Sequence, residues 1–160
     1  MSILSDADIT ARLLSKELTI DPFYEKNLTP NGYDLTIAEV AVPKLDVHTR
    51  EGEVEVPPLT WFAVSTKEYV KLSAMVTAQL WIRTSYARRG ILASFGKIDA
   101  GFEGNLTLSS FNASDKPVVM KIGETYAQMV FEMMSGEPKA LYDERSGHYQ
   151  GQRGVRLERL

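Results

Sequence analysis

Asp99 is the residue of this chain whose type and setting point most directly to chemistry. It lies in the turn-rich stretch GKIDAGFEG, where Gly101 and Gly104 allow the backbone to turn sharply and to approach a ligand closely. The apolar residues from Leu106 to Phe111 are typical of a strand, so we expect Asp99 at the mouth of a β-hairpin. A carboxylate fixed there can serve as a general base. An exposed aspartate that only caps its own turn is the alternative.

A second candidate site combines three guanidinium groups with two hydroxyls within seven residues: Arg83, Thr84, Ser85, Arg88 and Arg89. Arginine binds phosphate oxygens through two donors at once, and hydroxyls and turn N–H groups add further donors around the same anion. The cluster therefore predicts phosphate binding in a chain whose net charge is −3. A solvated basic turn, or salt bridges between subunits, would give the same composition.

Length and composition exclude several classes of protein. With 160 residues, 44% of them hydrophobic and 24% charged, the chain fits one soluble globular domain spanning residues 1–160. The acidic balance argues against nucleic-acid binding through a basic face. No apolar run approaches the roughly 20 residues of a membrane helix, and the N-terminus shows no signal pattern, so we expect no membrane partner and a cytoplasmic location.

The chain has no cysteine and two histidines, His48 and His148. Disulfides, thiolate nucleophiles and cysteine-ligated zinc are therefore excluded, and a Ser-His-Asp triad is poorly supplied. Base deamination that depends on a zinc ion held by His and Cys is excluded as well, because the chain has no cysteine. Any metal should be a hard cation held by oxygen atoms, including those of substrate phosphates.

The elements expected to position these residues are mostly short strands. Ser5, Asp6 and Asp8 resemble a capping box before an N-terminal helix that runs to about Lys16. Short alternating or apolar stretches separated by Gly and Pro then predict about a dozen strands, with a helical turn at residues 83–90 closed by glycine. We expect a mainly β fold, a jelly-roll β-barrel with one short helix. Residues 146–160 are polar and glycine-rich at their start, which indicates a flexible tail or lid.

Five motifs in order resemble one known family. They are NGYDLTI, RTSYARRG, GKIDAGFEG, GETYAQMVF and HYQGQ, preceded by LSDADI and IDPF. Together they are similar to the family that joins dCTP deaminase and the trimeric dUTPases, most closely its archaeal dUTPase branch, over nearly the whole chain. The resemblance implies a distorted jelly roll and a homotrimer, with the hexamer as an alternative, whose active sites lie between subunits.

The resemblance also implies roles for individual residues. Asp99 would deprotonate the water that attacks the α-phosphate, and Phe102 would lie under the deoxyribose and exclude a 2′-hydroxyl. The triphosphate would be held by Arg83, Thr84, Ser85 and Arg88 with help from Gln128, and Mg²⁺ would bind through the phosphates, with Asp34 contacting it through water. The remaining expected substrate contacts are Leu108, Ser109, Tyr142, His148 and Gln152. His148 stands where relatives often have lysine, so its phosphate contact would be weaker or pH-dependent.

Ser109 is the informative departure from the family pattern. Deaminating members carry a glutamate ten residues after the aspartate, and here that strand reads Leu106-Thr107-Leu108-Ser109. A serine hydroxyl cannot shuttle protons near neutral pH as a carboxylate does. We therefore expect a dUTP diphosphatase with uracil read mainly by backbone groups. The alternatives are a dCTP deaminase or bifunctional enzyme that uses another carboxylate, with Glu103 as one candidate, and a nucleotide-binding trimer without activity.

Overall fold

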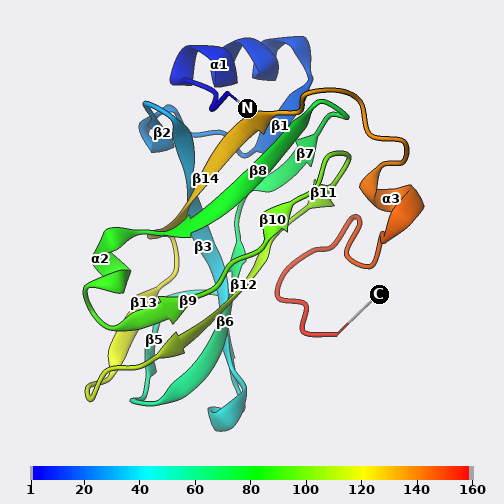
Figure 1. The fold of residues 1–160 in the computed structure, drawn as a ribbon. Helices are drawn as coiled ribbons and strands as arrows, with labels where there is room; N and C mark the ends of the chain where they lie inside the picture. The colour runs from blue at the N-terminus through cyan, green and yellow to red at the C-terminus, as the bar shows by residue number, and fades with distance from the viewer. Residues whose placement is uncertain (1, 159–160) are drawn as a thin grey trace.

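A computed structural model of the chain, describing residues 2–158, shows a mainly β domain built around one curled sheet (Figure 1). The strand order of this nine-stranded sheet is β10-β8-β14-β3-β6-β12-β9, and β2 and β4 also pair with β3. The strands are β2 (Leu28–Thr29), β3 (Gly32–Val42), β4 (Val47–Thr49), β6 (Thr60–Thr66), β8 (Val76–Ile82), β9 (Ile91–Ala93), β10 (Lys97–Ile98), β12 (Thr107–Asn112) and β14 (Thr125–Met133). The expected mainly β fold is confirmed.

Two smaller sheets complete the domain. One has the order β1-β7-β11, and the other pairs β13 with β5. Their strands are β1 (Leu18–Asp21), β5 (Glu53–Val56), β7 (Tyr69–Leu72), β11 (Glu103–Gly104) and β13 (Val118–Lys121). The helices are α1 (Asp6–Ser15), α2 (Thr84–Ala87) and α3 (Tyr142–Arg145), with 3-10 turns at Glu25–Asn27 and Pro43–Leu45. None of these helices is long and apolar enough to cross a membrane.

The core forms where the sheet curls around β3. Strand β3 is buried along most of its length because β14 covers one edge and β6 the other, and its Tyr33, Leu35 and Ile37 are fully buried. Phe62 of β6 and Phe131 of β14 close the same core. This packing fixes the positions of β8 and β12, from which the candidate site is built.

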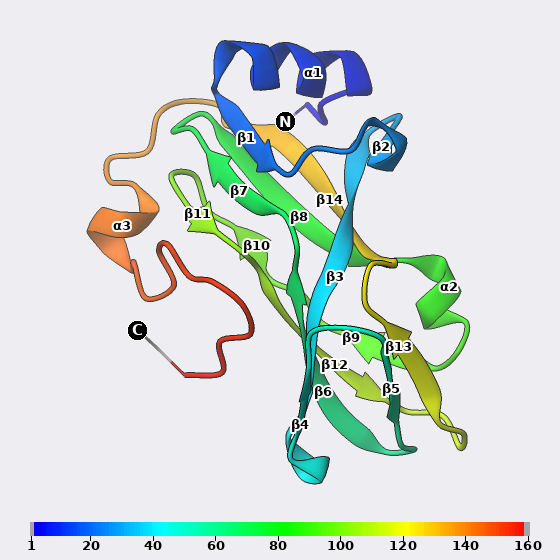
Figure 2. The same cartoon turned by 180° about the vertical axis from the view of Figure 1, so that it is seen from behind.

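The N-terminal helix begins where the sequence predicts it. The Ser5 side chain accepts from the Asp8 N–H, and the Asp8 carboxylate accepts from the Ser5 N–H, which completes the capping box. Helix α1 lies at one end of the molecule above β1 and β14, whereas α2 lies on one side of the molecule, beyond the end of β8 (Figures 1 and 2). The predicted helical turn at 83–90 is confirmed as α2, and Gly90 closes it at φ +84°.

The hairpin expected around Asp99 is present with a long connection: β12, which covers the strand expected from Leu106 to Phe111, pairs antiparallel with β9, and Asp99 lies between them in the chain. Two short strands, β10 and β11, interrupt that connection. β10 pairs with β8 and β11 pairs with β7, so the two strands flanking the turn belong to different sheets. The turn itself is present, because the Phe102 N–H donates to the Asp99 carbonyl at 3.2 Å. A turn signal reports only the local reversal of the chain, whereas strand pairing depends on partners far away in the sequence. Asp99 therefore lies on a corner that connects two sheets.

The C-terminal segment runs along the side of the domain that carries β11 and α3 (Figure 1). The Gly151 N–H donates to the Glu103 carbonyl at 2.7 Å, and the Asn105 N–H donates to the Gln152 carbonyl at 2.9 Å. Gln152 is 94% buried by these contacts. The flexibility expected for residues 146–160 stays a prediction, and residues 159–160 lie outside the described part of the chain.

Candidate active site

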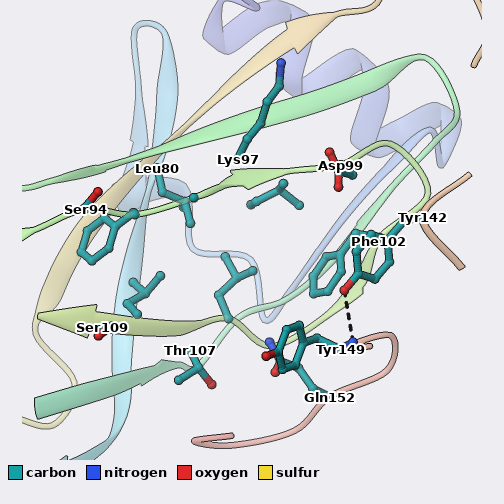
Figure 3. A pocket seen from close by; sticks show the side chains of 15 residues that line it. Leu80, Ser94, Lys97, Asp99, Phe102, Thr107, Ser109, Tyr142, Tyr149 and Gln152 are labelled. Atoms are coloured by element: carbon teal, nitrogen blue, oxygen red, sulfur yellow. Dashed lines mark hydrogen bonds between the residues drawn. The ribbon is translucent and has the colours of Figure 1, made fainter. Parts of the chain in front are cut away.

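A cavity of about 280 Å³ opens between β10, β12 and the C-terminal segment (Figure 3). We call it the Asp99 pocket. Of the residues predicted from the sequence, it brings together Asp99, Phe102, Leu108, Ser109, Tyr142 and Gln152. The other residues that line it are Leu80, Ser94, Phe95, Gly96, Lys97, Ile98, Leu106, Thr107 and Tyr149. Asp99 is the only carboxylate among these lining residues, and it is exposed to solvent.

One wall of the Asp99 pocket is aromatic. The rings of Phe102 and Tyr142 meet edge to face with centroids 5.4 Å apart, and the Tyr149 N–H donates to the Tyr142 hydroxyl at 3.1 Å (Figure 3). Helix α3, which carries Tyr142, was not expected from the sequence. Packed rings of this kind give a flat apolar surface suited to a sugar or a base.

Gln152 supplies the most constrained polar group of the pocket. Its Nε2 donates to the Asn105 carbonyl at 2.6 Å, so its Oε1 is left as an acceptor, and this buried oxygen has no hydrogen-bond partner among residues 2–158. Gly104 makes the approach possible, since a Cβ on it would lie 3.1 Å from the Gln152 backbone nitrogen. A buried acceptor without a partner is costly, and a ligand with an N–H donor would satisfy it.

Ser109 lies on β12 at another part of the pocket wall, and its hydroxyl is already in one hydrogen bond. The indole Nε1 of Trp61, on the neighbouring strand β6, donates to Ser109 Oγ at 2.5 Å. A second cavity of about 350 Å³ lies on this side, and Ser109 and Gln152 line both cavities, whereas Trp61 lines only the second. Sequence reasoning missed Trp61. The only signal in the sequence was a tryptophan within a predicted strand. The structure leaves its side chain 40% exposed.

The predicted phosphate cluster is not in the Asp99 pocket. Arg83 and Ser85 line a separate cavity of about 600 Å³ near the start of α2, together with Asp34. Arg83 is paired with Asp34 and also donates to the Thr125 hydroxyl. Burial raises the pKa of Asp34, and the Arg83 guanidinium opposes that shift. The cavity lined by Arg83 therefore offers guanidinium and hydroxyl donors suited to an anion.

Four predicted site residues line neither the Asp99 pocket nor the cavity of Arg83. Thr84 is exposed on α2, and Arg88 lines a different surface hollow with Arg89 and Lys116. Gln128 pairs across the sheet with Asp34, and its Nε2 donates to the Thr29 hydroxyl at 3.1 Å. His148 is exposed on the C-terminal segment. Within one chain these residues are not gathered around a common point.

Comparison with known proteins places the chain in a family. Residues 3–134 match the family described as dCTP deaminase-like. The chain belongs to the dCTP deaminase-like family. A relative named dCTP deaminase, from Pyrococcus horikoshii, is 44% identical over 141 residues, covering 86% of this chain and 88% of the relative. A relative from Sulfolobus islandicus rod-shaped virus 1 is named a probable deoxyuridine 5′-triphosphate nucleotidohydrolase; it is 37% identical over 157 residues, which is 97% of each chain.

Solved structures agree on the fold of this dCTP deaminase-like chain. The structure of a 2′-deoxycytidine 5′-triphosphate deaminase from Agrobacterium tumefaciens has a TM-score of 0.69 at 20% identity. The match covers 82% of this chain and 48% of the Agrobacterium protein, so this chain spans about half of that protein's length. The EIAV dUTPase has a TM-score of 0.57 at 18% identity, covering 81% of this chain and 98% of that one. The predicted resemblance to the joint deaminase and dUTPase family is confirmed. Its named members process deoxynucleotides.

Proposed function

We propose that this chain is a dUTP diphosphatase that converts dUTP to dUMP and diphosphate. The observation that supports it best is the lining of the Asp99 pocket, which contains one carboxylate and, at the strand position where deaminating members carry glutamate, the hydroxyl of Ser109. Hydrolysis at phosphorus requires one general base, and Asp99 is exposed where a water molecule can reach it.

In the proposed reaction the nucleotide binds with its sugar against Phe102. The Asp99 carboxylate accepts a proton from a water molecule while the water oxygen forms a bond to the α-phosphorus. The bond between that phosphorus and the oxygen bridging to the β-phosphate breaks, and diphosphate leaves with the electron pair. Asp99 then releases its proton to solvent. The unpaired acceptor Gln152 Oε1 would receive the N3–H of uracil, which cytosine lacks.

Mg²⁺ belongs to the proposal as a metal carried by the triphosphate. The described residues contain no group of three or more His, Asp or Glu side chains able to hold a metal, so the substrate oxygens would be its main ligands. Asp34 fits a contact through a metal-bound water, since it lines the same cavity as Arg83 and Ser85. When bound, the metal would offset the charge that develops on the phosphates.

The separation of the two cavities supports an assembly with sites between subunits. A nucleotide needs both a base pocket and a phosphate pocket, and in one chain Asp99 and Arg83 line different cavities. We propose a homotrimer, with a hexamer of two trimers as the alternative, in which the cluster around Arg83 of one subunit faces the Asp99 pocket of a neighbour.

A dCTP deaminase is the second candidate, favoured by the names of relatives at about 40% identity. It would need a base other than Ser109. Glu103 does not supply one, because it lies outside the lining of the Asp99 pocket and its carboxylate is paired with Lys71 Nζ at 2.8 Å. That contact lowers the pKa of Glu103. A trimer that binds nucleotide without turnover is a third reading, and activity measurements distinguish it.

The test is product analysis with dUTP and dCTP side by side in the presence of Mg²⁺. We expect dUMP and diphosphate from dUTP, and no uracil nucleotide from dCTP. Asp99→Asn should reduce kcat by about 100-fold or more while nucleotide still binds. Asp46→Asn, at an exposed turn, is the matched control. Release of dUTP or dUMP from dCTP would refute the assignment, and an inert wild-type chain that binds dUTP would favour the non-catalytic reading.

A further inference from the structure

The Trp61 side chain has no role in the proposed reaction, yet its polar atom is directed at the pocket wall. Trp61 pairs with Phe111 across β6 and β12, which places its indole on the same face as Ser109, two residues before Phe111. Its Nε1 donates to Ser109 Oγ. The ring is 40% exposed, so burial of apolar area alone is a weak reason for tryptophan at this position.

This contact restricts what the Ser109 hydroxyl can offer a ligand. An indole N–H is a donor only, so Ser109 Oγ must accept, and its own O–H must point away from Trp61. Ser109 then presents one proton and one remaining lone pair. Without the indole the hydroxyl would have two lone pairs free and could rotate to accept as readily as donate.

Gln152 imposes the opposite preference on the same pocket. Its Nε2 donates to the Asn105 carbonyl, which can only accept, so its Oε1 is the group of this amide that is left as an acceptor without a partner among residues 2–158. Ser109 and Gln152 line both adjoining cavities, and the pocket therefore presents a donor and an acceptor. The edge of uracil offers the complement, an acceptor at O4 beside a donor at N3. Cytosine offers the reverse, an amino donor beside an acceptor.

We propose that Trp61 is a positioning residue for specificity: by occupying a lone pair of Ser109 it turns the serine hydroxyl into a donor, which favours uracil over cytosine. This rests on the proposed function, since it assumes that the base enters the Asp99 pocket. Trp61 acts through Ser109 and touches no reacting atom. Ser109 keeps one lone pair that can still accept from a cytosine amino group. The expected effect of Trp61 is therefore a preference for uracil and not an exclusion of cytosine.

The experiment measures binding of the α,β-imido analogues of dUTP and dCTP by calorimetry, with Mg²⁺, so that turnover does not enter. The quantity is the ratio of the two dissociation constants. Trp61→Phe keeps the ring and removes the N–H, and we expect the preference for the uracil analogue to fall about fivefold, equivalent to about 1 kcal/mol. Trp81→Phe, at the other exposed tryptophan, is the matched control and should leave the ratio unchanged.

Ser109→Ala separates positioning from a general structural effect. If Trp61 acts through Ser109, Trp61→Phe should change the ratio in the wild-type background and have no effect on it in the Ser109→Ala background. An unchanged ratio in Trp61→Phe, or an equal change in both backgrounds, would overturn the inference and leave the proposed function intact. A wild-type chain that binds neither analogue, or does not prefer the uracil one, would overturn the proposed function and this inference with it.

Discussion

Asn105 allows a quantitative test of how the Asp99 pocket is supported. Its side chain is buried, and its Nδ2 donates to the carbonyls of Thr66, Lys67 and Glu68 at 3.1, 3.3 and 3.0 Å. Two hydrogens shared among three carbonyls correspond to about two full hydrogen bonds. Since each buried carbonyl left without a donor costs about 1–3 kcal/mol, Asn105→Ala should lower the free energy of unfolding by about 3 kcal/mol. At roughly 2–4 °C per kcal/mol, the Tm should fall by about 6–12 °C.

The assay is urea unfolding, supported by thermal melts, at one fixed protein concentration because assembly contributes to stability. Asn31→Ala is the matched control, since Asn31 is exposed and its side chain makes no hydrogen bond within the described residues; it should stay within about 0.5 kcal/mol of wild type. A loss below about 1 kcal/mol for Asn105→Ala would refute the reasoning. It would mean that water replaces the amide at the turn after β6.

Two further predictions concern a buried acid and a crowded glycine. Burial raises the pKa of Glu68 above its ordinary value of 4.5, against the effect of the Thr36 N–H, so the folded chain keeps this proton to higher pH than the unfolded chain does. Stability should therefore fall as pH rises from about 4.5 toward the raised value, and Glu68→Gln should remove that part of the fall; parallel unfolding curves for the two proteins between about pH 4 and pH 8 would contradict this. A Cβ at Gly101, which has φ +84°, would lie 2.9 Å from Leu141 Cβ at the start of α3, so Gly101→Ala should cost at least about 1 kcal/mol in urea unfolding and weaken nucleotide binding. Gly136→Ala, with open space around it, should do neither.

The parts of the fold that sequence predicts well are those whose signals are local. Ser5 and Asp8 fix the start of α1 through contacts three residues apart, and Gly90 ends the helical turn of α2 through its own positive φ. The strands flanking Asp99 show the limit. Their turn was predicted, but their partners β8 and β7 are distant in sequence, and no local pattern selects them.

The predictions for the candidate site show the same difference between local motifs and contacts that form only in the fold. The ordered motifs predicted that Asp99, Phe102 and Gln152 belong to one site, and the structure places all three in one pocket. Whether they act as proposed is for the kinetic experiments to establish. Trp61 was not predicted because its partner Ser109 is 48 residues away, and the contact exists only once β6 and β12 are paired.

The hydrogen bond between Trp61 and Ser109 also gives the protein an internal optical probe. The chain has two tryptophans, so the Trp81→Phe protein retains Trp61 as its sole indole fluorophore. That indole is half-exposed and donates to a side chain of the pocket wall, so its emission will respond to a change in polarity beside it. A base entering the Asp99 pocket alters that polarity. Occupancy of the pocket can therefore be followed by light emission from the unlabelled protein, without any modification of the nucleotide.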